Sequence, residues 1–237
     1  MTSFSDLGLA ETLLRALTAE GYTTPTPIQA QAIPALLTGR DLLGIAQTGT
    51  GKTAAFALPI LQRFLSDKRP VEPRTTRALV LAPTRELAAQ IGDSFRTYGK
   101  FMGVQVAVVV GGVSIGPQVK TLARGVDVLV ATPGRLLDHL QSGSVRLDTT
   151  SVVVLDEADH MLDLGFVVPI RKIMSKLPKK RHSLFFSATM PKEIATLAGE
   201  FLTDPAQVAV TPVATTAERV RQDVLMVDAG AKSSILV

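Results

Sequence analysis

The run GIAQTGTGKT, from Gly44 to Thr53, combines residue types that suit phosphate binding. Gly49 and Gly51 stand just before Lys52, and an apolar stretch of helical character follows. Glycines let backbone N–H groups turn inward around phosphate oxygens, and the start of a helix adds positive potential. A lysine at this position reaches the outer phosphates, and the hydroxyl beside it ligates Mg²⁺. The run predicts a Walker A nucleotide loop, with a plain glycine turn as the alternative.

A pair of acidic residues supplies the second half of that chemistry. Asp156 and Glu157 close an apolar run in SVVVLDEADH, residues 151–160, which is the Walker B arrangement. Beside a phosphate loop, such an aspartate holds Mg²⁺ through water, and the glutamate orients the attacking water. An acidic helix start is the alternative, because the helix dipole favours it in any case. Together with the phosphate loop, the catalytic interpretation of Lys52, Asp156 and Glu157 is favoured.

Short β-branched runs alternate with longer helical stretches along most of the chain. The predicted strands cover residues 41–46, 77–82, 104–110, 126–131, 151–156, 183–188 and 206–210. The predicted helices include residues 53–66, 85–98, 114–123, 133–142 and 191–202. The strands are apolar almost throughout, which indicates burial on both faces. This pattern predicts an α/β fold, an open and mostly parallel sheet with helices on both faces.

The positions of the motifs agree with such a sheet. In open α/β sheets, ligands bind beyond the carboxyl ends of the strands. The chemistry-bearing motifs follow residues 46, 82, 110, 131, 156 and 187, each at or near the end of a predicted strand. We therefore expect the binding sites to lie at that edge of the sheet.

The composition narrows the class of protein. The chain has 237 residues, a net charge of +4 and no cysteine, which excludes disulfides and cysteine-bound zinc. The N-terminus lacks a secretory signal, and the most apolar run, residues 104–113, is too short to span a bilayer. We expect a cytoplasmic protein with no membrane partner. The basic run at residues 171–182 is interpreted as a solvated helix face and turn.

The last segment, residues 211–237, differs from the rest of the chain. It begins loose and polar, continues as a strand-like run at 223–228 and stops on apolar ILV. Chain termini are usually polar and exposed. We expect residues 1–210 to form one domain and residues 211–237 to be a linker and the start of a missing second domain, with a short docked tail as the alternative.

The motifs resemble, in type and order, those of the first RecA-like domain of DEAD-box ATP-dependent RNA helicases. GYTTPTPIQ at 21–29 resembles the Q motif, with Phe4 as its upstream aromatic residue, and the later motifs are AQTGTGKT at 46–53, PTRELAAQ at 83–90, GG at 111–112, TPGR at 132–135, DEAD at 156–159 and SAT at 187–189. GVDVLVATPGRLLDHL and DEADHMLDLGF look closest to the bacterial RhlE-like group.

The resemblance implies a site for ATP and Mg²⁺. Its nucleotide-binding residues would be Phe4, Tyr22, Thr24, Gln29, Ala46, Gln47, Thr48, Gly49, Thr50, Gly51, Lys52 and Thr53. Thr53 and Asp156 would hold the metal. Gln29 would read the adenine edge, since a side-chain amide pairs bidentately with adenine, and Phe4 would stack on the base. By itself, Gln29 is equally an ordinary polar residue on a helix.

The resemblance also implies an RNA path made of small and basic residues. Its members would be Pro83, Thr84, Arg85, Gly111, Gly112, Thr132, Gly134 and Arg135. Such contacts hold the RNA backbone and carry no sequence information, while 2′-hydroxyl contacts distinguish RNA from DNA. Taken alone, Arg85 and Arg135 would be ordinary arginines at helix starts.

Three polar residues would link the two sites. The resemblance implies that Ser187 and Thr189 hydrogen-bond toward Asp159, although both also suit a cap for the helix after Pro191. The three histidines show no metal-ligand spacing. We expect His160 on a helix surface or interface, and His139 and His182 in structural or solvated positions.

The resemblance predicts the nucleotide-binding half of a monomeric RNA helicase. In that family the second RecA-like domain supplies an arginine that accelerates phosphoryl transfer by about 10³–10⁵. We therefore expect this chain alone to hydrolyse little ATP. A P-loop motor acting on DNA or another substrate is the first alternative. A non-catalytic RNA-binding domain is the second.

Overall fold

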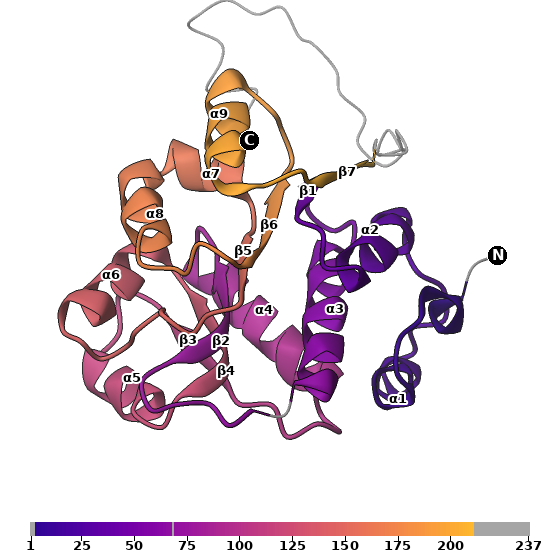
Figure 1. Cartoon of the computed structure of the whole chain (residues 1–237), viewed down its shortest axis with the longest axis horizontal. Helices are drawn as coiled ribbons and strands as arrows, with labels where there is room; N and C mark the ends of the chain where they lie inside the picture. The colour runs from indigo at the N-terminus through magenta and orange to yellow at the C-terminus, as the bar shows by residue number, and fades with distance from the viewer. Residues whose placement is uncertain (1–2, 68, 211–237) are drawn as a thin grey trace, which may run out of the picture.

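A seven-stranded parallel sheet forms the centre of the molecule (Figure 1). The computed structural model describes residues 3–67 and 69–210. The strands are β1 (Leu42–Ile45), β2 (Thr76–Leu81), β3 (Val106–Val109), β4 (Val126–Ala131), β5 (Val152–Leu155), β6 (His182–Ser187) and β7 (Ala206–Ala209). Their order is β3-β4-β2-β5-β6-β1-β7, and each described pairing is parallel. All carboxyl ends therefore meet at one edge.

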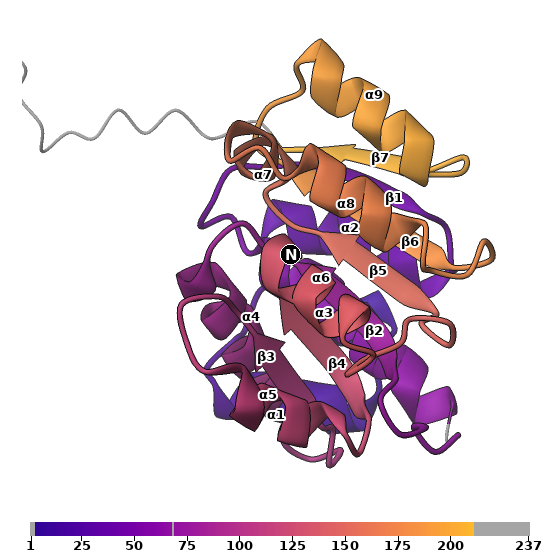
Figure 2. The same cartoon turned by 90° about the vertical axis from the view of Figure 1, so that its left-hand side faces the viewer.

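Helices cover both faces of the sheet. They are η1 (Phe4–Leu7), α1 (Glu11–Ala19), α2 (Pro27–Leu37), α3 (Lys52–Ser66), α4 (Arg85–Tyr98), α5 (Ile115–Leu122), α6 (Pro133–Gln141), α7 (Ala158–Asp163), α8 (Val167–Met174) and α9 (Lys192–Phe201). Residues of α1 to α4 pack in one apolar core, and residues of α5 to α9 belong to or pack against a second. Figure 2 shows α5, α6, α8 and α9 lying over the strands on the second face.

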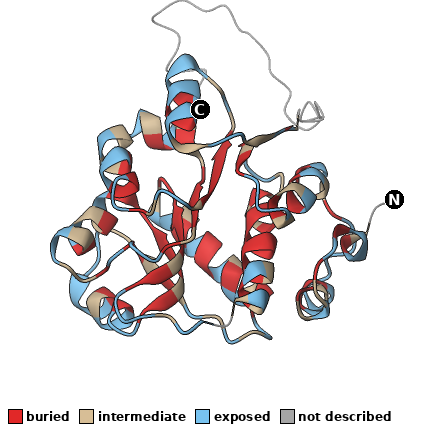
Figure 3. Ribbon diagram, viewed as in Figure 1, coloured by how far each residue is buried: buried red, intermediate tan, exposed pale blue. Residues whose placement is uncertain are grey.

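The central strands are buried on both sides because successive side chains enter different cores. Val80 and Val154 belong to the core under α3 and α4, whereas Leu79 and Val153 belong to the opposite core. Figure 3 shows the buried residues concentrated along the strands and the inner faces of the helices. This double burial explains the near-continuous apolar runs, and the exposed helix faces keep the charges in water.

The predicted fold class is confirmed. The structure differs from the prediction in the bounds of some elements and in helices that were not predicted. The predicted strand at 104–110 is confined to 106–109, because only that part pairs with β4. The sequence patterns did not single out α1 or α7 as helices. The basic run begins on α8, where Arg171 and Lys172 are exposed as expected. The predicted tail at 211–237 lies outside the described residues.

No helix among the described residues is long and apolar enough to cross a bilayer.

Candidate nucleotide and RNA sites

The phosphate loop connects β1 to α3 and owes its shape to two glycines. Gly49 and Gly51 have φ angles of 83° and 94°, in the left-handed region that disfavours side chains. A Cβ on Gly51 would also collide with the amide of Gln29. Gly44, predicted as the start of the loop, lies instead inside β1, where a Cβ would strike the ring of Phe186. Gly44 is a packing residue.

Lys52 is the first residue of α3 and points into a buried position. Its side chain is 5% exposed, and its Nζ lies 3.9 Å from Oδ1 of Asp156. No described residue accepts a hydrogen bond from this ammonium group. A buried charge without hydrogen bonds is costly, so such a group suits an anionic ligand. The position of Lys52 therefore fits a phosphate of the nucleotide.

The two carboxylates after β5 have different surroundings. Burial raises the pKa of Asp156 to about 6, the Lys52 ammonium opposes that rise, and Glu157 adds to it. Glu157 has a φ of 54°, an uncommon conformation for a residue with a side chain. Its Oε1 accepts a 2.7 Å hydrogen bond from the Thr48 hydroxyl of the phosphate loop. Glu157 is therefore held against the loop that would carry the phosphates.

These groups line a cleft of about 470 Å³, which is within the range of ligand pockets. Of the predicted nucleotide residues, those in its lining are Tyr22, Gln29, Thr48, Gly49, Gly51, Lys52 and Thr53, together with Asp156 and Glu157. Phe4, Thr24, Ala46, Gln47 and Thr50 are outside that lining. One face of α4 forms another wall with Leu87, Gln90, Ser94 and Tyr98; the first two lie in the motif at 83–90, which was predicted to bind RNA, and the last two lie outside every motif. The only sequence signal for this wall was that these residues are spaced to fall on one face of a helix.

The oxygen-bearing side chains in this cleft suit Mg²⁺ that is shared with a bound phosphate, rather than a metal ion bound by protein ligands alone. Mg²⁺ keeps several waters and takes one or two protein ligands beside substrate phosphates. The Thr53 hydroxyl and the Asp156 carboxylate both line the cleft and would suit this role. Among the described residues, no group of three or more His, Cys, Asp or Glu side chains forms a separate metal cage.

Gln29 joins the cleft wall to the phosphate loop. Its Oε1 accepts a 2.9 Å hydrogen bond from the backbone N–H of Thr26. Its Nε2 donates a 3.1 Å bond to the carbonyl of Gly51, the residue just before α3. Gln29 is only 2% exposed, so both ends of its amide are engaged within the protein. The structure thus gives Gln29 a second role in holding the loop, beside the predicted reading of adenine.

The aromatic residues differ from the predicted arrangement. Phe4 is 4% exposed and packs edge-on against Tyr22, with ring centroids 6.5 Å apart. Tyr22 is 40% exposed and lines the cleft. This geometry favours Tyr22 over Phe4 for direct contact with a base, because Phe4 is buried and outside the cleft lining. Stacking by Phe4 stays a prediction.

The predicted RNA residues gather at the carboxyl ends of β2, β3 and β4, which are neighbours in the sheet. Thr84 caps α4 by accepting a 3.2 Å hydrogen bond from Leu87 N–H, and Thr132 precedes α6. Gly112 has a φ of 73°, and a Cβ there would strike Arg85. Both Nη groups of Arg135 donate to the carbonyl of Val113 at 3.0 Å. Arg85 thus lies close to Gly112, and Arg135 holds the backbone just after the glycine pair.

Asp159 is the acceptor at the predicted link between the two sites. Its Oδ2 accepts hydrogen bonds from Thr189 N–H and Thr189 Oγ1, each 2.9 Å long, and from Ala188 N–H at 3.2 Å. Burial acts to raise the pKa of Asp159, but the hydrogen bonds from Thr189 and from His160 N–H, with a smaller contribution from the Ser187 hydroxyl, lower it. The Ser187 hydroxyl is buried and lies near Asp159, although it meets no strict hydrogen-bond geometry with any described residue. The predicted contact is thus well formed for Thr189 and weaker for Ser187.

The histidines occupy the expected kinds of place. His139 is fully buried, its Nε2 lies 3.0 Å from Oε1 of Gln118, and burial lowers its pKa. Burial also lowers the pKa of His182, whose Nε2 lies 2.6 Å from the Arg40 carbonyl. His160 is exposed, with Nδ1 3.6 Å from Oε2 of Glu157.

Comparisons with known proteins agree with this geometry. The DEAD/DEAH box helicase family matches residues 26–197. The chain is 46% identical over 222 residues to the ATP-dependent RNA helicase DeaD of Klebsiella pneumoniae, covering 93% of this chain and 34% of that protein. It is 41% identical over 236 residues to the DEAD-box ATP-dependent RNA helicase CshA of Bacillus cereus, covering 100% of this chain and 44% of that protein.

A solved structure gives the same result at the level of the fold. A DEAD box protein from the hyperthermophile Methanococcus jannaschii superposes with a TM-score of 0.82 at 36% identity, over 89% of this chain and 56% of that one. The chain thus spans less than half the length of these two curated relatives. The family match covers most of the chain, and the matched region contains the phosphate loop and the acidic pair described above. The chain belongs to the DEAD/DEAH box helicase family.

Proposed function

We propose that this chain is the ATP-binding and RNA-binding half of an ATP-dependent RNA helicase. It would bind Mg·ATP in the cleft between the phosphate loop and α4 and hold the RNA backbone at the ends of β2, β3 and β4. With a second RecA-like domain it would hydrolyse ATP and separate short RNA duplexes. The names of the relatives support this proposal, since both are called ATP-dependent RNA helicases.

The buried ammonium of Lys52 is the observation that carries the proposal. It sits at the start of α3, beside the Asp156 carboxylate, with no hydrogen-bond acceptor among the described residues. A phosphate would supply the missing acceptors, and the N-terminus of the 15-residue helix α3 would add to the attraction. A domain that bound RNA alone would have no use for this costly arrangement.

The proposal assigns separate tasks to the residues of the chain. Lys52 binds the phosphates, Asp156 and Thr53 hold Mg²⁺, and Glu157 orients the attacking water. Mg²⁺ supplies charge stabilisation when bound. Gln29 selects adenine, Arg85 and Arg135 contact RNA phosphates, and Thr189 with Asp159 links the two sites. A cytoplasmic location and a monomeric state belong to the same proposal.

A calorimetric titration with Mg·ATP and Mg·GTP tests the nucleotide assignment. We expect ATP to bind more tightly than GTP by about tenfold, the scale of one or two net hydrogen bonds. Lys52→Ala should abolish binding of both nucleotides, and Gln29→Ala should remove the preference for ATP. Gln141→Ala, on the exposed end of α6, is the matched control. Equal affinities for ATP and GTP, or normal binding by Lys52→Ala, would overturn the assignment.

A further inference from the structure

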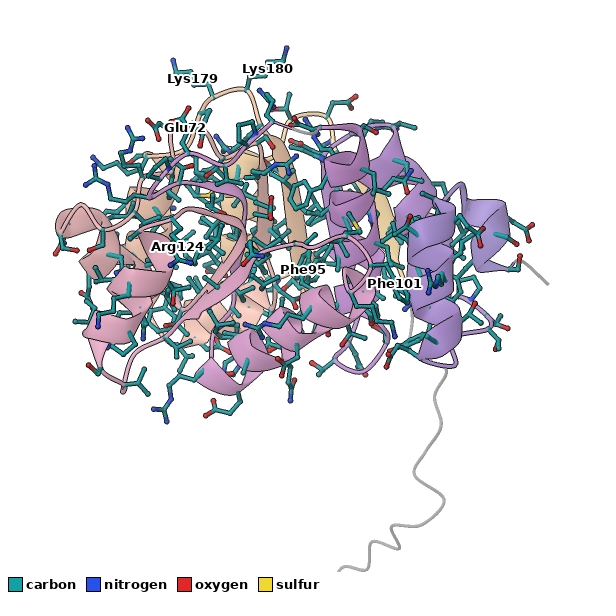
Figure 4. The ribbon with its side chains drawn as sticks, turned by 90° about the horizontal axis from the view of Figure 1, so that it is seen from below. Glu72, Phe95, Phe101, Arg124, Lys179 and Lys180 are labelled. Atoms are coloured by element: carbon teal, nitrogen blue, oxygen red, sulfur yellow. The ribbon has the colours of Figure 1, made fainter. Side chains whose placement is uncertain are left out.

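A groove of about 810 Å³ lies at the amino edge of the sheet, away from the nucleotide cleft. One wall is the chain at Arg69 to Val71, and the other is the end of α5 with the start of β4. The side chains that bring charge to it are Arg69, Lys120, Arg124 and Asp127. Figure 4 shows this part of the molecule from below, with Arg124 labelled.

Two of these charges are neutralised inside the protein. Oδ1 of Asp127 lies 3.1 Å from Nη1 of Arg77, and its Oδ2 accepts a 2.9 Å bond from Gln105 N–H. Arg69 is paired with Asp67 through two hydrogen bonds of 2.8 and 2.7 Å. Lys120 and Arg124 are exposed, and neither has an ion-pair partner within 4.0 Å in the described part of the chain. The groove therefore presents two uncompensated cations.

Helix α5 connects this groove to the predicted RNA path. The helix begins three residues after Gly112, and Lys120 and Arg124 lie near its other end. Gly116 and Lys120 are four residues apart on α5, so they share one side of the helix, and Arg124 follows in the turn two residues after the helix ends. The segment from Gly111 to Gly125 contains no acidic residue. A stripe without acidic side chains, formed by the roughly 12 Å length of the eight-residue α5, therefore runs from the glycine pair to the two cations of the groove.

We propose that this stripe and groove form a second contact region for single-stranded RNA. It would bind the phosphates of nucleotides that continue beyond the predicted path at the ends of β2, β3 and β4. Basic grooves that follow a backbone are the usual means of sequence-independent single-strand binding. The continuity with Gly112 favours RNA over an acidic protein as the occupant. This inference rests on the proposed function, because it assumes that RNA reaches Gly112.

The two cations also have a purely structural explanation. Lys120 lies in the last turn of α5 and Arg124 two residues after it, where positive charge stabilises the helix dipole. That role predicts a lower melting temperature when the charges are removed and no change in RNA binding. RNA contact predicts instead a change that depends on RNA length and salt.

The experiment compares the double variant Lys120→Ala/Arg124→Ala with Lys172→Ala/Lys176→Ala. The control removes two exposed lysines at the same four-residue spacing, on and just after α8. Each protein is titrated with single-stranded RNA of about 5 and about 15 nucleotides, lengths within the range of single-strand sites. The titrations are repeated across a series of salt concentrations, and melting temperatures are recorded.

We expect the Lys120/Arg124 variant to bind the long RNA about tenfold more weakly, with unchanged affinity for the short RNA. The slope of log K against log salt should fall by about 1.4, because each single-strand phosphate contact contributes about 0.7. The control should match the unaltered protein. Equal losses on both RNAs, or a variant that behaves like the control, would overturn the inference.

Two more results distinguish an acidic protein ligand from a failure of the proposed function. If poly-glutamate bound as tightly as the long RNA and required Lys120 and Arg124, the groove would be an acidic-protein site and the inference would be wrong. If the unaltered protein bound neither RNA, the proposed function itself would fail. A loss of affinity that is confined to the long RNA supports both the second contact region and the proposed function.

Discussion

The proposed nucleotide end and the proposed RNA end of the sheet handle charge in opposite ways. At the ends of β1 and β5, Lys52 and Asp156 are buried, and the ammonium finds no hydrogen-bond acceptor among the described residues. At the ends of β2 and β4, Arg85 is half exposed, and Arg135 already donates two hydrogen bonds to a backbone carbonyl. The first region is incomplete without a ligand. The second is satisfied without one.

This difference has consequences for affinity and for mutation. A buried and unsatisfied charge makes a large contribution to ligand binding, and its removal has a large effect. An exposed arginine such as Arg85 would meet RNA in a medium of high dielectric, where its contribution is small and salt weakens it. Arg135 is only 12% exposed, but its guanidinium is already engaged with the Val113 carbonyl. We therefore expect steep losses at the nucleotide end and graded losses at the RNA end.

The largest expected effect belongs to Glu157→Gln. The exchange keeps the size of the side chain and an acceptor for the Thr48 hydroxyl, so Mg·ATP should still bind. It removes the carboxylate that orients water, so hydrolysis by the chain joined to a second RecA-like domain should fall by about 10²–10⁴. Single-turnover hydrolysis beside a binding titration measures both. Turnover within twofold of normal would contradict the assigned role.

The next effect is a dependence on pH. The buried Asp156 has a pKa of about 6, well above that of an exposed aspartate. Ionisation of this buried carboxylate lowers the free energy of unfolding as the pH rises through 6. Protonation of Asp156 at lower pH therefore stabilises the free protein. Mg²⁺ requires the deprotonated form, so Mg·ATP affinity, measured by titration across a pH series, should fall by up to tenfold per pH unit below about 6.

A histidine offers a competing explanation for that profile. Nδ1 of His160 lies 3.6 Å from Oε2 of Glu157, so a change at this contact could also alter Mg·ATP affinity. We expect His160→Gln to leave the pH profile of Mg·ATP affinity unchanged. If the profile disappeared in this variant, the buried aspartate would not be its cause.

A smaller effect is expected at the RNA end. Arg85→Ala should weaken RNA binding several-fold for every sequence and lower the salt slope by about 0.7. Stability should change by less than about 0.5 kcal/mol, because the side chain is exposed. Arg135→Ala should also lower the free energy of unfolding by about 1 kcal/mol, since its bonds to Val113 are lost. Equal stability in the two variants would contradict the contrast drawn between these arginines.

The smallest effect concerns the link between the two ends. Thr189→Val keeps the shape of the side chain and removes the 2.9 Å bond from Oγ1 to Asp159, while two backbone N–H bonds remain. We expect RNA to stimulate hydrolysis a few-fold less, with ATP affinity unchanged. Thr196→Val, on exposed α9, is the matched control. Full stimulation in Thr189→Val would remove the hydroxyl from the link.

The strands of the sheet and many of the residues that line the cleft could be predicted from the sequence. Runs such as VVVL at 152–155 are apolar on both faces, a pattern that is typical of a buried parallel strand. The bond from Gln29 to the Gly51 carbonyl joins residues 22 apart, and it depends on how α2 packs on α3. The α4 wall at Ser94 and Tyr98 likewise depends on packing. Neither contact could be predicted from spacing alone, because both depend on how the helices pack.

ATP hydrolysis with and without single-stranded RNA tests the central claim most directly. It should be measured on this chain alone and on the chain joined to a second RecA-like domain. We predict little hydrolysis by the chain alone, whether or not RNA is present, and RNA-stimulated hydrolysis by the joined form. Brisk hydrolysis by the chain alone would contradict the account, because Lys52, Asp156 and Glu157 would then be sufficient without a second domain.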